Sequence, residues 1–356
     1  MTEKTVRIGV VGLGFMGQVH AENVSEFGHE VVAGADLDDG VREEFGTRFG
    51  AATYEDFGEM YEEEALDAVA VSVPNKIHEP AVVAALERGL DVLCEKPLAH
   101  TLESAERIAE VARESEGFCA VNFHNRITAA AEMFKGYQEE GRFGEVTHVQ
   151  GNYVRWRGIP GLGSWFTDRE LAGGGALVDI GVHAIDFALY ALDFPEVEEV
   201  MGITRANFGT REDYVDPEDW GMDQADGTFD VEDSVTALIR CANGKTISLE
   251  VAWAASQEPT NEFTIRGTDA GATLSLGEDH LRLFETGRQG TDHFVRSELE
   301  GDLPETGWAA TDKLFVESVA SGETPELNTV EQALTVQRVI DGIYRSSEKG
   351  SSVRID

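Results

Sequence analysis

Cysteine is scarce in this chain of 356 residues, which contains only Cys94, Cys119 and Cys241. Three cysteines cannot build a disulfide framework, and no two of them form a Cys-x-x-Cys pair. The sequence therefore predicts a protein of the reduced cytoplasm.

Lysine is also scarce. Only 7 of the 28 basic residues are Lys, against 67 acidic residues, and the formal net charge is −39. Nucleic acids and anionic membranes are bound by patches of Lys and Arg, so neither is an expected partner. The acidic residues are scattered among periodic apolar segments, which indicates a folded acidic surface rather than disorder. Concentrated salt, with a Debye length of about 3 Å at 1 M, screens the repulsion on such a surface, so the composition predicts a halophilic protein.

Long hydrophobic runs are missing as well. The first residues lead into a predicted strand rather than a signal peptide, and no apolar run of membrane-spanning length follows. We therefore expect no membrane segment. With 42% hydrophobic residues, a chain of this length is suited to two folded domains.

The first part of the chain alternates short apolar strands with helical stretches. We expect the strands at residues 6–14, 30–36, 68–74, 90–97 and 118–126. A βαβα order predicts a parallel, doubly wound sheet with helices on both faces. The pattern changes near Arg126, so the sequence predicts a Rossmann domain over residues 1–126.

Residues 127–356 are rich in strands of alternating polarity, separated by turns such as Asn-Gly and Asp-Ala-Gly. This pattern predicts an α+β domain with a large, mainly antiparallel, open-faced sheet. Helices are expected at 129–141, 173–192, 308–321 and 330–347, the last three packed against that sheet. The polar, acidic residues 209–228 are expected to form a loop over one end. The fold class is therefore α/β, a Rossmann domain followed by this second domain.

The hexapeptide GLGFMG follows the first strand and begins the first helix. In that context Gly12 is expected to make the tight turn, Gly14 to admit a pyrophosphate to the backbone, and Gly17 to let helix and strand pack closely. The helix N-terminus would face the phosphates with its N–H groups. The motif predicts a dinucleotide site; the alternative is a structural turn without a nucleotide.

Asp36 ends the second strand, where a carboxylate can bind both ribose hydroxyls of NAD. A 2′-phosphate about 4 Å from that carboxylate would cost roughly 4 kcal/mol at an effective dielectric constant of 20. Asp38 and Asp39 add to the repulsion, and Arg42 is the nearby candidate for binding a phosphate. NAD is therefore the expected cofactor, with NADP as the alternative.

The stretch GGGALVDIGVHAIDF at 173–187 combines an apolar helical face with a polar row. Asp179, His183, Asp186 and Tyr190 stand at i, i+4, i+7 and i+11 on one side of the predicted helix. Asp179 and His183 are either a helix pair worth a few tenths of a kcal/mol or part of an active site. We expect Asp186 and Tyr190 to be structural, and no bound metal, because no second His or Cys cluster accompanies the row.

Several motifs along almost the whole chain resemble the Gfo/Idh/MocA oxidoreductases, the family of glucose–fructose oxidoreductase and inositol dehydrogenase. The most specific are Glu95-Lys96-Pro97 and the Asp179-x-x-x-His183 pattern. The supporting motifs are GLGFMG, VPNKIHEP, NFHNR, VEDSVTALIRCANG and SSEKGSSVRI. The resemblance implies a Rossmann domain and a second domain whose open sheet mediates homodimers or homotetramers.

The resemblance also implies roles for individual residues. Lys96, Asp179 and His183 become the catalytic group, and these three with Arg126 become the substrate ligands. An imidazole, with an ordinary pKa near about 6.5, can take a hydroxyl proton near neutrality, while an ammonium group stabilises developing alkoxide charge. The expected cofactor site comprises Gly12, Leu13, Gly14, Phe15, Met16, Asp36, Pro74, Asn75, His78, Glu95, Lys96 and Trp165.

These residues predict an NAD(P)-dependent dehydrogenase that oxidises a secondary hydroxyl of a sugar, inositol or related polyol. One alternative is an NAD-dependent glycoside hydrolase, in which the hydride is borrowed and returned. The other is a sugar sensor that binds the dinucleotide without turnover, against which the intact Lys96 and His183 argue. The sequence does not select one sugar, because substrate choice depends on loops such as 209–228.

The acidic composition generates a prediction about salt. Lowering KCl from molar to millimolar concentration should reduce Tm by several degrees, because unscreened repulsion acts on the compact state, and 1 kcal/mol shifts the Tm of a large domain by about 2–4 °C. Thermal unfolding followed by circular dichroism measures the effect. Sucrose at matched osmotic strength is the control, and a Tm independent of KCl would contradict the halophilic interpretation.

Overall fold

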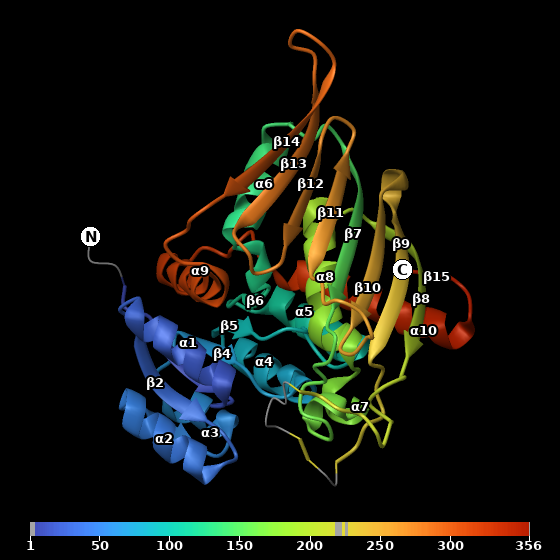
Figure 1. Ribbon diagram of the computed structural model, residues 1–356. Helices are drawn as coiled ribbons and strands as arrows, with labels where there is room; N and C mark the ends of the chain where they lie inside the picture. Colours follow the sequence, from blue (N-terminus) through green and yellow to red (C-terminus); the bar gives the residue numbers. More distant parts are fainter. Residues whose placement is uncertain (1–3, 218–222, 225–226, 356) are drawn as a thin grey trace. The chain divides into compact units, whose positions relative to one another are not determined.

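The computed structural model of this protein describes residues 4–217, 223–224 and 227–355 (Figure 1). Residues 218–222 and 225–226 of the expected acidic loop lie outside the described residues. The chain divides into two compact units. Unit 1 comprises Met1–Phe123 and Trp308–Leu334, and unit 2 comprises His124–Gly307 and Thr335–Asp356.

Unit 1 is built on a parallel sheet, which within the described residues has six strands in the order β3-β2-β1-β4-β5-β6. The strands are β1 (Arg7–Val11), β2 (Glu30–Ala35), β3 (Ala52–Tyr54), β4 (Ala68–Val71), β5 (Asp91–Cys94) and β6 (Cys119–Val121). The strand order reverses at β1, which pairs with both β2 and β4. In sheets of this kind ligands bind beyond the carboxyl ends of the strands at such a reversal. The predicted doubly wound parallel sheet is confirmed.

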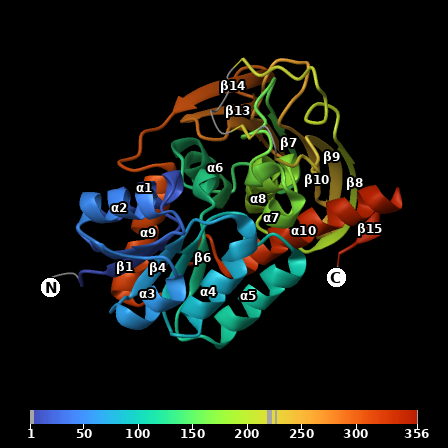
Figure 2. The ribbon, with the colours of Figure 1, turned by 90° about the horizontal axis from the view of Figure 1, so that it is seen from below.

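Helices connect these strands and cover both faces of the sheet. They are α1 (Phe15–Glu26), α2 (Asp39–Phe49), α3 (Phe57–Glu63), α4 (His78–Leu86) and α5 (Leu102–Glu114). Figure 2 shows α1 and α2 on one side of the strands, and α3, α4 and α5 on the other. Side chains cap several of the helices: Asp38 accepts from two N–H groups of α2, and Thr101 accepts from the Ser104 N–H of α5.

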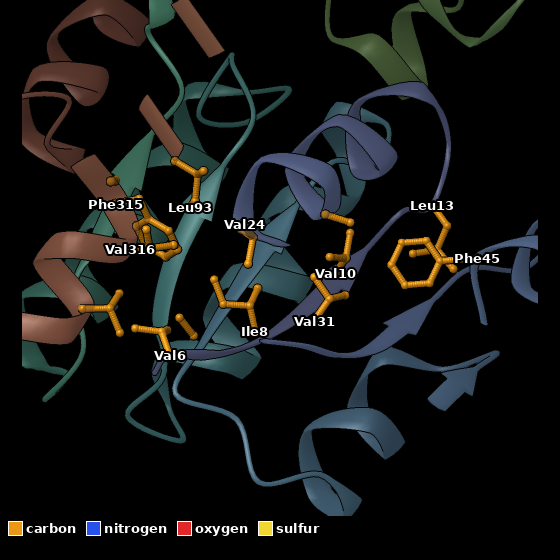
Figure 3. Close-up of a cluster of buried hydrophobic side chains, with 14 residues drawn as sticks. Val6, Ile8, Val10, Leu13, Val24, Val31, Phe45, Leu93, Phe315 and Val316 are labelled. Carbon is orange, nitrogen blue, oxygen red and sulfur yellow. The ribbon is translucent and has the colours of Figure 1, made fainter. Parts of the chain in front are cut away.

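Helix α9 (Gly307–Ser321) belongs to the core of unit 1. Its Phe315, Val316 and Val319 are buried in one cluster with side chains of β1, α1 and β5 (Figure 3). The expectation that 308–321 packs against the second sheet is therefore wrong. The sequence shows that one helical face is apolar, but the pattern does not say which of two sheets buries it. The predicted domain boundary at residue 126 stays a prediction.

Unit 2 contains the second sheet, with nine strands over the described residues. They are β7 (Val146–Val154), β8 (Val197–Arg205), β9 (Ser234–Cys241), β10 (Thr246–Ala252), β11 (Glu262–Gly267), β12 (Gly271–Ser275), β13 (His280–Gly287), β14 (His293–Glu300) and β15 (Val353–Arg354). Their order is β14-β13-β12-β11-β7-β10-β9-β8-β15, and the pairs are antiparallel except β7 with β10. The predicted mainly antiparallel sheet is confirmed.

Helices pack on one face of this sheet. Figure 2 shows α6 (Ala129–Glu139), α8 (Val182–Ala191) and α10 (Val330–Lys349) along it, with the short α7 (Arg169–Ala172) near α8. The other face carries exposed apolar side chains, including Met201, Ile203 and Leu238. Strand β9 accordingly alternates buried and exposed residues. The sheet is open-faced, as the sequence predicts.

One helical stretch among the described residues, Arg169–Ala191, is long and apolar enough to cross a membrane by length and composition. The expectation from the sequence that the chain has no membrane segment stays a prediction. Most of the stretch (83%) is buried inside the protein. A buried core helix passes the same test, so the stretch is weak evidence for a membrane span.

The position of α9 generates a stability prediction. Phe315→Ala should lower the free energy of unfolding by about 3–5 kcal/mol, because it removes a fully buried ring from the unit 1 core. Urea unfolding in molar KCl measures it. Phe294→Ala is the matched control, since the Phe294 side chain is 93% exposed, and should change stability by less than about 0.5 kcal/mol. Equal small effects of both substitutions would contradict the packing of α9.

Candidate active site

The glycine turn between β1 and α1 shows which of its glycines the fold itself requires. Gly12 has a φ of +86°, and a Cβ on Gly17 would lie 1.9 Å from the Gly12 carbonyl oxygen. Both positions therefore exclude a side chain for structural reasons. A Cβ on Gly14, by contrast, would meet no atom within 4 Å. The open space at Gly14, at the N-terminus of α1, fits a pyrophosphate that approaches the backbone.

The other residues of the turn differ in exposure. The Leu13 side chain is buried, Met16 is half-buried, and Phe15 is exposed, with its ring edge-on to Trp308 at a centroid distance of 6.2 Å. No side chain caps α1 among the described residues, so its first turn presents backbone N–H groups. The cofactor contacts of Leu13, Phe15 and Met16 stay predictions.

The Asp36 carboxylate is hydrogen-bonded to the backbone of the glycine turn. Its Oδ2 accepts a hydrogen bond from the Leu13 N–H at 2.8 Å, and its Oδ1 accepts from the Asp38 N–H at 3.0 Å. Arg42 donates to the Asp36 carbonyl oxygen at 2.6 Å and pairs with Asp39. The carboxylate that would bind the ribose is thus fixed in place, and Arg42 lies beside it, where it can partly offset the repulsion of a 2′-phosphate.

The segment after β4 contains Pro74 and the 3₁₀ helix η1 (Asn75–Ile77). Asn75 is buried, and its cofactor contact and that of Pro74 stay predictions. His78 is fully buried, with Nδ1 2.9 Å from the Pro97 carbonyl oxygen and Nε2 2.9 Å from the Val73 carbonyl oxygen. Burial lowers the pKa of His78. Both ring nitrogens face backbone carbonyl oxygens of the protein interior, which does not favour a place for His78 in the cofactor groove; that place stays a prediction.

Glu95 and Lys96 follow β5. The Glu95 side chain is buried and accepts from the Asn122 amide at 2.7 Å and from its neighbour, the Lys96 N–H, at 3.1 Å. Its Oε1 also lies 3.2 Å from Nε2 of the buried His20. This arrangement makes Glu95 a structural anchor of the segment that carries Lys96, and it does not favour the expected role of cofactor ligand.

The polar row of unit 2 begins on a π-helical turn, η4 (Leu177–Gly181), and continues on α8. Oδ2 of Asp179 accepts from Nε1 of the buried Trp253 at 2.9 Å and lies 3.9 Å from the Arg155 guanidinium. The His183 ring is 6% exposed and meets the His124 ring edge-on at a centroid distance of 4.9 Å. Single π turns inside helices occur frequently at functional sites.

Asp186, the third residue of the polar row, forms an internal ion pair with Arg126. Asp186 and Arg126 are both buried, and the guanidinium binds the carboxylate through Nε and through its terminal nitrogen. The Arg126 guanidinium also lies 5.4 Å from the centre of the Tyr190 ring and 4.9 Å from that of Phe194. The Arg126 side chain is 0% exposed and its guanidinium is bound to Asp186, which does not favour the expected role of substrate ligand; that role stays a prediction. The ion pair joins η2 (His124–Arg126) to α8.

The start of the π turn is held by Glu232. Its Oε1 accepts hydrogen bonds from the N–H groups of Gly175 and Leu177, each at 3.0 Å, and from the Tyr344 hydroxyl at 2.9 Å. A Cβ on Gly175 would lie 2.0 Å from the Glu232 carbonyl oxygen, so this close approach requires glycine. Burial raises the pKa of Glu232. The contacts fix the chain immediately before Asp179.

Trp165 lies on the short helix η3 (Trp165–Thr167) and stacks on Phe166 at a centroid distance of 3.9 Å. The hydroxyl of Thr167 donates to the Thr228 carbonyl oxygen at 2.6 Å, so this segment is tied to the end of the acidic loop. The expected contact of Trp165 with the nicotinamide stays a prediction. Over the described parts of the chain, no three or more His, Cys, Asp or Glu side chains form a group that could hold a metal ion.

Sequence reasoning missed several residues that support this site. No local sequence pattern identifies Trp253 and Tyr344 as site residues, because their hydrogen-bond partners, Asp179 and Glu232, are distant in the sequence. His124 and Glu232 do lie inside the motifs NFHNR and VEDSVT. The residues missed are His20, His124, Arg155, Glu232, Trp253, Asp312 and Tyr344.

Comparison with known proteins agrees with this architecture. Residues 6–123 match the model of an oxidoreductase family with an NAD-binding Rossmann fold, and residues 132–273 match a GFO/IDH/MocA C-terminal domain. D-glucoside 3-dehydrogenase of Escherichia coli (strain K12) is 30% identical over 100% of this chain and 99% of its own length. D-xylose 1-dehydrogenase (NADP(+)) 2 of Haloferax volcanii is 29% identical over 98% of each chain. A structure of levoglucosan dehydrogenase in complex with NADH and L-sorbose has a TM-score of 0.85, with 25% identity over 99% of each chain.

The fold, the glycine turn and the match to the family model together define the class of this protein. The protein is an NAD(P)-dependent oxidoreductase with an NAD-binding Rossmann domain. The chain belongs to the Gfo/Idh/MocA family.

The glycine turn generates a prediction that separates folding from cofactor binding. Gly14→Ala should leave Tm unchanged, because the added Cβ meets no protein atom, and should weaken NAD binding at least about tenfold, or about 1.4 kcal/mol, by obstructing the pyrophosphate. Calorimetric titration with NAD and thermal unfolding measure the two effects. Gly17→Ala is the matched comparison and should lower Tm as well as affinity, because its Cβ meets the Gly12 carbonyl oxygen. Normal NAD affinity in Gly14→Ala would show that the pyrophosphate lies elsewhere.

Proposed function

We propose that this enzyme oxidises a secondary hydroxyl group of a sugar, inositol or related polyol, with NAD as the hydride acceptor. The observation that carries the proposal is the geometry around the π turn, where a nearly buried His183 and an Asp179 held by Trp253 follow one another on one helix. The full-length relatives whose names include a glucoside dehydrogenase and a xylose dehydrogenase support a carbohydrate substrate.

His183 takes the proton of the reacting hydroxyl, because an imidazole is the side chain best suited to accept a proton near neutrality. Lys96 binds the same oxygen and stabilises the negative charge that develops on it. NAD, when bound, supplies an acceptor for the hydride that leaves the carbon, so the alcohol becomes a carbonyl group.

Asp179 contributes to substrate position. One of its oxygens accepts from Nε1 of Trp253, and the Arg155 guanidinium lies near the same oxygen. These two groups fix the direction of the carboxylate. An oriented carboxylate is a good acceptor for a sugar hydroxyl next to the one that reacts.

NAD is preferred to NADP in this proposal because Asp36 places a negative charge beside the glycine turn, at the position where a 2′-phosphate would be attached. Arg42, which contacts the Asp36 carbonyl oxygen, is the residue that would bind a 2′-phosphate if NADP were used. The named relatives include an NADP-dependent enzyme, so the choice has to be measured on this protein.

Three further properties belong to the proposal. The enzyme acts in a reduced cytoplasm, which is supported by three buried free cysteines. It is adapted to high salt, which is supported by the charge of −39 and by a relative from Haloferax volcanii. It forms a homodimer or homotetramer through the open sheet, supported by the exposed apolar side chains of β8 and β9.

Substitution of the proposed catalytic residues should reduce turnover. Lys96→Ala and His183→Ala should each lower kcat by roughly two to four orders of magnitude, the range for removing a general base or a charge stabiliser. The double variant should lose much less than the product of the single losses if both residues act on one oxygen. Steady-state kinetics and NAD titrations measure these effects, and unchanged turnover in either single variant would contradict the mechanism.

A panel of sugars, inositols, polyols and glycosides, incubated with excess NAD, tests the reaction class. Net NADH with at least one substrate supports the dehydrogenase. Glycoside cleavage without net NADH would replace it with the hydrolase, and tight NAD binding with neither signal would replace it with the sensor. Gly14→Ala serves as the control for signals that do not depend on the cofactor.

A further inference from the structure

A row of buried charged groups crosses the interior of unit 1. It runs from Asp312 on α9, through His20 on α1, to Glu95 after β5, and all three side chains are buried. His20 Nδ1 lies 2.7 Å from an oxygen of Asp312, and His20 Nε2 lies 3.2 Å from an oxygen of Glu95. Two carboxylates that are far apart in the sequence are thus bridged by one imidazole.

The remaining oxygens of the two carboxylates have their own donors. The Asn23 amide donates to Asp312 at 2.6 Å. Oε2 of Glu95 accepts from the Lys96 N–H at 3.1 Å, and Oε1, the oxygen that faces His20, also accepts from the Asn122 amide at 2.7 Å. The row therefore ends on the backbone of Lys96.

Both ring nitrogens of His20 face carboxylate oxygens, and only the imidazolium can donate from both. Burial alone would favour neutral imidazole, but the charge and hydrogen bonding of Asp312, together with those of Glu95, raise the pKa of His20 to about 10. Burial likewise opposes ionisation of Glu95, yet the hydrogen bond and charge of His20, with the charge of Lys96 and the Asn122 amide, lower the pKa of Glu95 to about 2. The charged forms therefore persist across the neutral range.

Stability alone is a weak reason for such an arrangement. Removing a charged group from water costs several kcal/mol, and well-packed apolar side chains often replace a buried ion pair without loss. The row has a second consequence, because it fixes the chain at Lys96. His78, whose Nδ1 lies 2.9 Å from the Pro97 carbonyl oxygen, fixes the same segment on the other side of Lys96.

We propose that His20, as a buried imidazolium between Asp312 and Glu95, is a positioning residue that sets the place of Lys96 relative to the dinucleotide turn. His20 and the glycine turn belong to the same short stretch, since α1 begins at Phe15. A displacement of the turn is thus transmitted to Glu95 and from there to the Lys96 backbone. The inference rests on the proposed catalytic role of Lys96.

His20→Gln is the test variant, because glutamine can still hydrogen-bond but carries no charge. We expect kcat to fall about 10- to 100-fold, as small displacements of a catalytic group do, while NAD affinity stays within about threefold. Hydrogen–deuterium exchange of the peptide spanning residues 92–99 should accelerate, which is a readout independent of turnover.

The pH profile distinguishes positioning by charge from a merely structural role. Without the imidazolium, burial raises the pKa of Glu95, so the carboxyl group is protonated at acidic pH and ionises as pH rises. The kcat of His20→Gln should therefore increase between about pH 6 and 9 relative to wild type. The charged and titratable groups that face Glu95 are His20, His78, Lys96 and Cys94.

Two further variants complete the design. In His20→Gln/Glu95→Gln the carboxyl group next to Lys96 is gone while the buried Asp312 carboxyl remains, so the additional rise of kcat with pH should disappear, and its persistence would contradict the route through Glu95. Arg113→Gln is the matched control, because its ion pair with Glu331 also joins distant segments of unit 1 but is exposed and lies outside the row. It should leave kcat, pH profile and exchange unchanged.

The proposal is overturned if His20→Gln has the kcat, pH profile and exchange of wild type. It is also overturned if Tm and the fraction of folded enzyme fall but kcat per folded molecule does not. If His20→Gln fails to fold, histidine NMR of the wild type decides: an imidazolium that persists to pH 9 supports the proposal, and titration near pH 6.5 overturns it. Should no sugar be oxidised, exchange and NMR still test the positioning, so its failure and that of the proposed function remain distinguishable.

Discussion

The interior of each unit depends on the rule that a buried charge must be neutralised where it lies. In unit 1 the Asp312–His20–Glu95 row obeys it by joining α9, α1 and the segment after β5. In unit 2 the Arg126–Asp186 pair joins η2 to α8. In both cases one end of the interaction lies beside a residue with a proposed chemical role, Lys96 in the first and His183 in the second. Neutralising these charges therefore also positions the site.

The helix that begins near Ala176 shows how one row of polar residues is divided by its surroundings. Asp179 meets the indole of Trp253, which follows β10, whereas His183 and Asp186 meet an imidazole and a guanidinium that both belong to η2. The row is not a solvated stripe, because Asp179, His183 and Asp186 are each held by a partner inside unit 2. The π turn and the hydrogen bonds of Glu232 lie at the first residues of the row, whereas the ion pair of Asp186 lies two turns after Asp179.

The charge distribution differs sharply between surface and interior. The chain carries 67 acidic residues, yet the buried carboxylates discussed above each have a cation or several donors. Salt screens the exposed charges and hardly affects the buried ones. Stability can therefore depend on the surrounding salt while the position of the buried charged groups does not.

Much of the fold and part of the site could be predicted from the sequence. Period-two and period-3.6 patterns specify strands and helices, and local motifs specify turns, so the two sheets, the glycine turn and the Lys96 segment followed from neighbouring residues. Three matters were decided only by tertiary structure. The apolar face of α9 lies in the unit 1 core, because periodicity identifies a buried face but not the surface that buries it. Arg126 and His78 are interior residues because their partners, Asp186 and Pro97, are distant in sequence. His20 bridges Asp312, 292 positions away, and no local pattern encodes a contact of that range.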